Sequence, residues 1–256
     1  MNAEVKDAVV AAVWCFIFSG IFGMAWSLNL RYGEHTFETF SLLDKVEWCR
    51  RTCSTLHASI VVPGVVMCLI RTSVSGENVA FYAPPLCRLV FNVSVGYFVM
   101  DAVLAAYWRV RCWRATVAYN LLAVAPLAVN NFVPSCHCGG AVLALFLLVE
   151  VPTLRLNLLG ALDHPSKAAA AAARRSALGF GACASFYALW FLARVLLPTY
   201  ALGLLYDVVL PAWYEERSAG DMWRCVLPGA ASANVVAFFS FYAFFSSLSA
   251  DIFCRR

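Results

Sequence analysis

Seven apolar runs dominate this chain of 256 residues, and each is close to the length that crosses a bilayer. A helix of about 20 apolar residues spans the roughly 30 Å of hydrocarbon in a membrane. Helices satisfy their own backbone hydrogen bonds there, where no water can do so. The sequence therefore predicts an all-α, polytopic membrane bundle of about seven transmembrane helices. The predicted spans are residues 8–28, 54–71, 86–107, 116–133, 139–159, 178–200 and 226–248.

The composition agrees with this class of protein. Hydrophobic residues make up 62% of the chain and charged residues 13%, whereas soluble domains average about 45–50% apolar and about 25% charged residues. The net charge is only +4, and the basic residues form no extended patch, so we expect no nucleic-acid partner. The first apolar run is long for a signal peptide and lacks a basic leading segment, so we expect it to remain as a span.

The distribution of Lys and Arg predicts the orientation of the bundle. With seven spans, twelve of these residues fall in the segments on one side and five on the other. Because cytosolic loops carry the excess of positive charge, we expect a lumenal or extracellular N-terminus and a cytosolic C-terminus. The longest connections, residues 29–53 and 201–225, are predicted to contain amphipathic helices at the membrane surfaces.

The chain divides into three predicted parts. Residues 1–44 form the first span and a cytosolic interfacial segment, residues 45–250 form a transmembrane domain, and residues 251–256 form a short basic tail. No internal repeat of the kind found in transporters is visible. The paired signatures of seven-helix receptors are absent as well, so we do not favour either class.

Polar and ionisable residues lie inside the predicted spans, where they are costly and usually face a bundle interior or a cavity. Counted at about 1.5 Å per residue, residues from four spans fall in the cytosolic half of the membrane. Tyr97 shares a helix face with one of them, Asp101, because the two are four residues apart. The candidate site residues are His57, Tyr97, Asp101, Tyr119, Asn120, Glu150, Arg155 and Asn157.

The carboxylate of Asp101 is the hardest of these groups to dismiss. A buried carboxylate must be paired or protonated, and both Arg155 and His57 are candidate partners. Two interpretations stay open: a structural ion-pair network, or a site for a lipid headgroup or for catalysis. His57, near the end of its span, also fits a simple hydrogen-bonded histidine.

The cysteines predict a disulfide but no metal site. Cys87, Cys136, Cys138 and Cys225 all fall at predicted lumenal ends of spans, and an oxidising lumen favours a disulfide among them. The sequence Cys136-His137-Cys138 lacks a fourth ligand and the usual ligand spacing. We therefore expect no bound metal.

Four segments, in the same order and spacing, carry a resemblance to the TLC-domain family. STLHA at residues 54–58 resembles its Ser-x-x-His-Ala signature, and GYFVMD at 96–101 resembles its Gly-Tyr-x-x-x-Asp segment. EVPTLRLN at 150–157 is similar to its Glu-x-Ser-x-x-Phe-x-Asn segment, and FLARVLLP at 191–198 to its sixth, Arg-containing segment. The resemblance covers roughly residues 45–250.

One departure from the family pattern bears on activity. Ceramide synthases of this family carry two adjacent histidines at the start of the fourth core span, where this chain has Tyr119 and Asn120. Histidine is the natural general base near neutral pH. The resemblance therefore implies a non-catalytic protein of the endoplasmic reticulum or another endomembrane, which binds a lipid and influences membrane lipid composition, homeostasis or trafficking. Its site would consist of Glu150, Asp101, Arg155 and His57, with no cofactor.

The alternative is an acyl-CoA-dependent acyltransferase. In this interpretation His57 is the base, Asp101 orients it, and Arg155 faces the phosphates of CoA. The discriminating feature is geometric, because His57 and Asp101 must lie within hydrogen-bonding distance and open on a cytosolic tunnel. The identity of the lipid and the oligomeric state stay open.

Overall fold

The structure is a computed structural model that describes residues 2–32, 35–75, 84–136, 139–162, 185–216 and 223–253. These residues form helices joined by short turns, with no strand among them. Six helices in this part of the chain are long and apolar enough to cross a membrane, which confirms the polytopic helical class. They are Ala3–Arg31, Leu42–Thr72, Pro85–Trp108, Trp113–Phe132, Ser185–Glu215 and Trp223–Tyr242.

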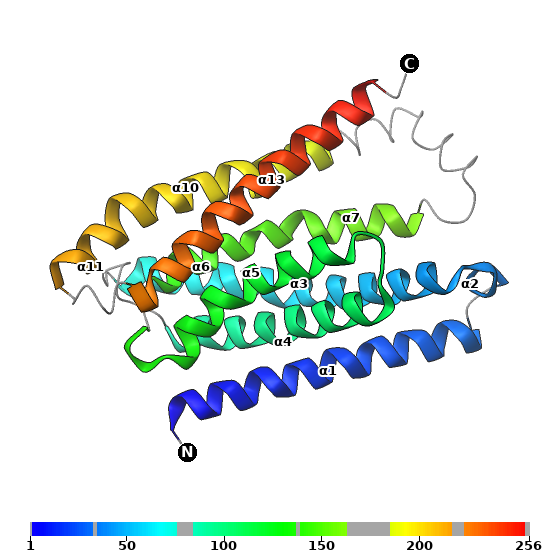
Figure 1. Cartoon of the computed structure of the whole chain (residues 1–256), viewed down its shortest axis with the longest axis horizontal. Coiled ribbons are helices and arrows are strands. Elements are labelled where there is room, and N and C mark those ends of the chain that lie inside the picture. Colours follow the sequence, from blue (N-terminus) through cyan, green and yellow to red (C-terminus); the bar gives the residue numbers. More distant parts are fainter. Residues whose placement is uncertain are drawn as a thin grey trace.

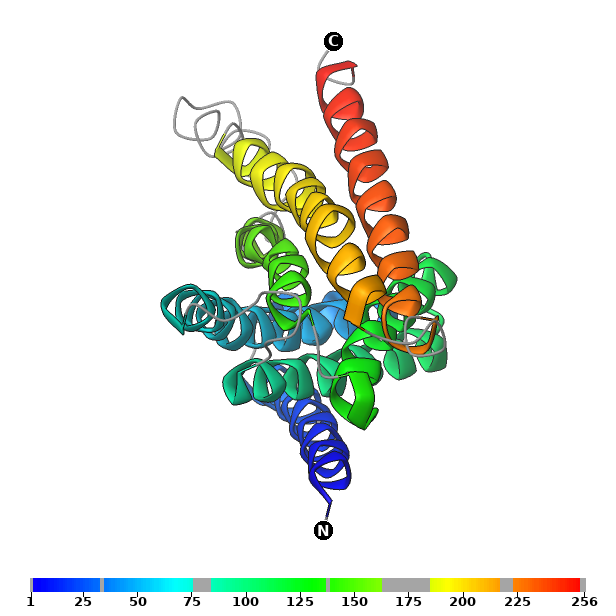
Figure 2. The same cartoon turned by 90° about the vertical axis from the view of Figure 1, so that its left-hand side faces the viewer.

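The helices pack in layers around α4, the most buried of the long helices. Figure 2 shows α1 on one side of the layer that contains α3, α4 and α5, and the last helices on the other side. Helix α1 begins and α13 ends at opposite ends of the long axis (Figure 1). The first elements are α1 (Ala3–Tyr32), α2 (His35–Thr39), α3 (Leu42–Ser75), α4 (Pro85–Trp108) and α5 (Trp113–Phe132). The later elements are η1 (Pro134–Cys136), α6 (Gly140–Leu147), η2 (Leu148–Glu150), α7 (Val151–Leu162), η3 (Leu192–Leu196), α10 (Leu197–Leu204), η4 (Leu205–Val209), α11 (Leu210–Glu216) and α13 (Leu227–Phe253).

The predicted span at residues 139–159 is not one regular helix. It divides into α6, the 3₁₀ turn η2 and α7, and its apolar helical part is shorter than the six long helices. Pro152 explains the break, because proline removes a backbone donor and its ring clashes with the preceding turn. The irregular turn includes Glu150, so it helps to set the direction of that side chain.

Two predicted surface helices are wrong in their boundaries. The segment 29–53 contains the end of α1, the short α2 and the first turns of α3, which continues without interruption to Ser75. The segment 201–225 likewise continues the preceding helix through α10, η4 and α11 as far as Glu216. Charged residues near the helix ends made both segments resemble loops, although the helices extend through them. Residues 254–256 of the predicted tail lie outside the described part.

The predicted disulfide is confirmed and joins Cys136 to Cys225. It links η1, which follows α5, to the beginning of the last long helix. Cys138 lies outside the described residues. Cys87, the fourth cysteine of the predicted group, is a buried free thiol. The disulfide therefore closes one end of the region between α5 and α13.

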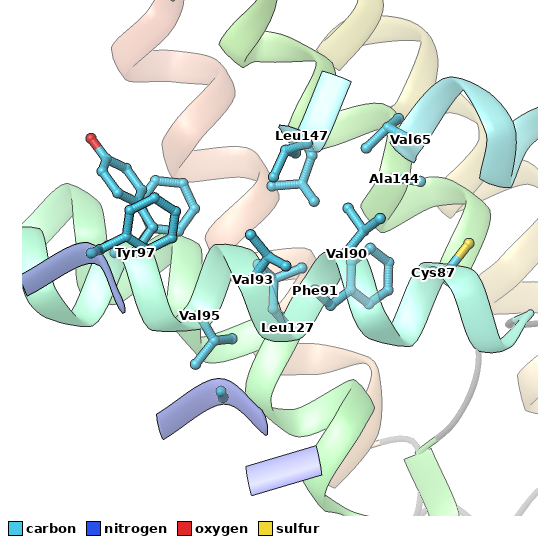
Figure 3. Packing of buried hydrophobic residues seen from close by; sticks show 14 of the residues in the cluster. Val65, Cys87, Val90, Phe91, Val93, Val95, Tyr97, Leu127, Ala144 and Leu147 are labelled. Carbon is cyan, nitrogen blue, oxygen red and sulfur yellow. The ribbon is translucent and has the colours of Figure 1, made fainter. Parts of the chain in front are cut away.

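The two largest apolar cores stabilise the two sides of the molecule. The larger one is built on α4 and includes Phe18, Phe91 and Leu127; Figure 3 shows its close packing. The second core is built on α10, η4, α11 and α13 around Trp213, which is 1% exposed. The polar residues of the predicted site lie mainly on α3, α4, α5 and α7, and thus beside the larger core.

Gly96 allows α1 to pack directly on α4. A Cβ atom at this position would lie 2.7 Å from both the Ala11 carbonyl oxygen and the Cys15 amide nitrogen. These are backbone atoms, which cannot rotate away. We expect Gly96→Ala to lower the free energy of unfolding by about 1–3 kcal/mol, the usual range for overpacking. The measurement is the melting temperature in detergent.

A matched control for this prediction lies on α1. A Cβ atom at Gly20 would meet no heavy atom within 4 Å, and alanine favours a helix interior over glycine by about 1 kcal/mol. Gly20→Ala should therefore leave the melting temperature unchanged or raise it. An equal fall for both variants would contradict the close contact between α1 and α4.

Candidate functional site

A buried ion pair joins α3 to α4 in the polar interior. Arg50 donates from Nε and Nη2 to the two carboxylate oxygens of Asp101, at 2.9 and 2.8 Å. Asn120 of α5 donates to Asp101 Oδ2 at 2.8 Å, and Glu47 accepts from Arg50 Nη1 at 2.8 Å. The Arg50 and Asp101 side chains are 11% and 8% exposed. Three helices are thus connected through one carboxylate, with the two-bond geometry that makes Arg–carboxylate pairs strong.

This partner of Asp101 differs from the two that the sequence suggested. His57 bonds elsewhere, so that assignment is wrong, and the side chain of Arg155 lies outside the described residues. Arg50 was overlooked because it precedes the apolar run 54–71 and so resembles a loop residue. Helix α3 in fact begins at Leu42, which places Arg50 about two turns inside the helix.

His57 lies in an enclosed aromatic pocket. Its ring stacks on Tyr97 with centroids 4.1 Å apart, and the rings of Phe18 and Phe98 meet it edge-on. Nε2 lies 3.2 Å from Ser94 Oγ, and Nδ1 has no hydrogen-bond partner. The side chain is 0% exposed. Among the described residues His57 is therefore not paired with Asp101, although the acyltransferase hypothesis requires that pair.

Glu150 and Arg194 form a second polar group between η2 and η3. The Glu150 side chain is buried and lies beside Thr153. Arg194 donates from Nε to the Val149 carbonyl at 3.0 Å and from Nη2 to Thr153 Oγ1 at 3.1 Å. Its charge acts on the Glu150 carboxylate without a direct ion pair. Arg194 lies in a π-helix, a rare conformation that is frequent at functional sites.

Arg194 was not among the predicted site residues. Depth counting placed it in the other half of the membrane, far from Glu150. The signal that could have included it was the Arg-containing segment at residues 191–198, which already supported the family resemblance.

The other predicted residues connect these groups. Asn157 of α7 donates to Thr55 Oγ1 at 3.1 Å and to the Arg51 carbonyl at 3.3 Å. The Tyr97 hydroxyl lies close to Ser54, and the charges of Glu150 and Arg194 act on the Tyr119 hydroxyl. The structure therefore brings together the predicted residues whose side chains it describes. These are His57, Tyr97, Asp101, Tyr119, Asn120, Glu150 and Asn157.

A separate polar cluster at the opposite end of α4 was not predicted. Arg88 pairs with Asp7 of α1, and Asn92 Nδ2 donates to Asp7 Oδ1 at 2.9 Å. Asn131 of α5 donates at 2.8 Å to both Asn92 Oδ1 and the Arg88 carbonyl. This cluster fastens α1 and α5 to α4, and we assign it to the support of the fold.

An apolar hollow lies between α5, α6 and α13. Its volume is about 450 Å³, which includes the space at its open side that is continuous with the surroundings. A neighbouring hollow of about 460 Å³ shares several lining residues with the first, including Pro126, Phe146 and Ala233. Together they extend from Tyr119 and Val149 at one end to Cys225 at the other. Val149 directly precedes Glu150, so the hollow ends beside the second polar group.

These features define a multi-pass membrane protein with a polar interior and an adjoining apolar hollow. A family model described as the TLC domain matches residues 47–253, and the chain belongs to the TLC-domain family. It is also similar to TLC domain-containing protein 4 C of Dictyostelium discoideum, at 25% identity over 134 residues. That match covers 50% of this chain and 46% of the relative, so the chain spans about half the length of the curated relative that it matches.

Proposed function

We propose that this protein binds a membrane lipid and thereby influences lipid composition, homeostasis or trafficking in its membrane. The observation that carries the proposal is the apolar hollow between α5, α6 and α13, which ends beside Glu150 and Arg194. An acyl chain would fill the apolar part, and the headgroup would meet the polar end.

The lining of the hollow supports an acyl chain as the occupant. Leu122, Leu127, Leu143 and Phe146 supply much of its wall, and aliphatic and aromatic side chains gain from contact with hydrocarbon. Its open side also fits an occupant that enters laterally from the bilayer. Ser232 and Tyr119 are the polar residues among those that line the first hollow.

The polar end supports a headgroup site. Glu150 and Arg194 come from separate elements, η2 and η3, and are close enough to interact without pairing directly. Ionisable groups inside a membrane are expensive and usually mark a functional site. By contrast, Arg50 and Asp101 satisfy each other, and His57 is enclosed. We therefore assign the headgroup to Glu150, Arg194, Thr153 and Tyr119, and treat the Arg50 pair as the support of this site.

The membrane and its orientation belong to the same proposal. We place the protein in the endoplasmic reticulum or another endomembrane, with the N-terminus lumenal and the C-terminus cytosolic. The excess of Lys and Arg on one side supports this orientation. The Cys136–Cys225 disulfide supports it as well, because it lies at the end of the bundle that would face an oxidising lumen.

The test is the set of lipids that copurifies with the full chain in mild detergent, identified by mass spectrometry. Ala233→Phe places a ring in the hollow, because Ala233 lines both parts of it. We expect the wild type to retain one lipid class above its share of the bulk membrane, and Ala233→Phe to reduce that retention about tenfold, which corresponds to about 1.4 kcal/mol.

Ala231→Phe is the matched control, because Ala231 lies on the same helix and is exposed. It should retain the lipid as the wild type does. Thr153→Val removes the hydroxyl shared by Glu150 and Arg194 and should change which headgroups are retained. A wild-type profile equal to that of the bulk membrane would overturn the proposal, and retained CoA or acyl-CoA would favour the acyltransferase instead.

A further inference from the structure

Two cysteines outside the polar interior face each other across α3 and α4. Cys68 and Cys87 are both 0% exposed, and their thiols lie close enough to interact. Both belong to the larger apolar core. In Figure 3 the sulfur of Cys87 points to the side of α4 on which Val65 and Ala144 lie. The structure records both as free thiols.

The two helices approach closely at this position. A Cβ atom at Gly64 would lie only 2.6 Å from Val90 Cγ2. Gly64 precedes Cys68 by one turn of α3, and Val90 follows Cys87 by about one turn of α4. Because the helices run antiparallel, the cysteines occupy the next matching positions along the contact. A disulfide needs Cα atoms about 4.4–6.8 Å apart, and a glycine at a helix contact lets the two backbones approach closely.

The same end of the bundle already holds a disulfide. Cys68 lies near the end of α3 and Cys87 near the beginning of α4. Cys136 follows the end of α5 and bonds to Cys225. The ends of α3 and α5 and the beginning of α4 lie together at one end of the long axis (Figure 1). An environment that oxidises Cys136 and Cys225 therefore also suits Cys68 and Cys87.

We propose that Cys68 and Cys87 form a second disulfide, which locks α3 to α4. The oxidant is a small-molecule disulfide such as oxidised glutathione. The thiolate of one cysteine attacks a sulfur of the oxidant, releasing one small thiol and forming a mixed disulfide. The second cysteine thiolate then attacks the protein sulfur of that mixed disulfide and releases the other small thiol. The two protein thiols give up two protons and two electrons, and the oxidant becomes two thiols.

The burial of both thiols determines when this exchange occurs. An enclosed thiol reacts poorly with dissolved oxidants, so the bond forms before α3 and α4 have packed, or while this end of the bundle opens. Once formed, it holds the two helices that carry Arg50 and Asp101. The bond would thus fix the contact from which the ion pair is built.

The test is disulfide mapping on the full chain purified from membranes. Free thiols are blocked with N-ethylmaleimide under denaturing conditions, and the protein is digested without reductant and analysed by mass spectrometry. We expect a cross-linked pair of peptides that contain Cys68 and Cys87, beside the Cys136–Cys225 pair. Reduction followed by oxidised glutathione in mild detergent should restore it.

Cys53 supplies the control. Trypsin leaves Cys53 and Cys68 on one peptide, so Cys53→Ala assigns the bond and should leave the cross-link in place. Cys87→Ala should abolish it and leave Cys68 alkylated. The proposal is overturned if Cys68 and Cys87 carry N-ethylmaleimide in wild-type molecules whose Cys136–Cys225 bond is intact, before and after treatment with oxidised glutathione. This measurement of cysteine alkylation is made on the wild type and does not depend on the folding of a variant.

Discussion

Replacing Asp101 with leucine is expected to lower the free energy of unfolding by about 3–5 kcal/mol, because it leaves a buried charge without its partner. Arg50 donates two hydrogen bonds to this carboxylate, and Asn120 donates a third. Glu47 stays bonded to Arg50 Nη1, but its side chain is 45% exposed, and the Nε and Nη2 groups of Arg50 lose their acceptors. The measurement is the melting temperature of the purified protein in detergent, together with the fraction that elutes as a single species.

The double variant Arg50→Met/Asp101→Leu tests the assignment of the partner. Replacing both members of a buried ion pair with apolar side chains is often neutral, so the double variant should recover much of the loss. Asp207→Leu, at an exposed position, should change the melting temperature little. A double variant as unstable as Asp101→Leu alone would show that Arg50 is not the residue that depends on Asp101.

Removing the Cys136–Cys225 bond is the second change with a large expected effect. The two cysteines are 89 residues apart in the sequence, and loss of a native disulfide commonly costs about 2–5 kcal/mol. We expect Cys225→Ser to lower the melting temperature in the absence of reductant. Cys112→Ser, which changes an exposed free thiol, is the control. Equal melting temperatures for Cys225→Ser and the wild type would contradict a stabilising role.

Helix class and the polar interior could both be predicted from the sequence, for different reasons. Apolar runs of membrane length leave few alternatives to helices, and this part of the prediction is confirmed. The depth of each residue in the membrane, counted along antiparallel spans, correctly grouped Asp101 with Asn120. This depth depends only on the residue number and on the direction in which the span crosses the membrane. The helix ends were wrong where charged residues continue a helix beyond its apolar run, as Arg50 does in α3.

The pairing of residues across helices could not be predicted in this way. Arg50 meets Asp101, His57 meets Ser94, and Gly64 meets Val90. These contacts share one antiparallel register, which is set by the packing of α3 on α4 and not by any spacing within one helix. The position of the hollow also depends on packing. Gly229 and Ala233, four residues apart on α13, are the type of small-residue pair that permits close helix contacts. This pair was the sequence signal that could have indicated which face of α13 lines the hollow.

The disulfide between Cys136 and Cys225 also holds the two ends of the last long helix in different ways. One end of α13 is covalently anchored beside α5, whereas the other extends away from the α3–α5 layer (Figure 2). The disulfide therefore fixes the separation of α5 and α13 at one end of the hollow, whereas side-chain packing alone sets it at the other end, near Tyr119.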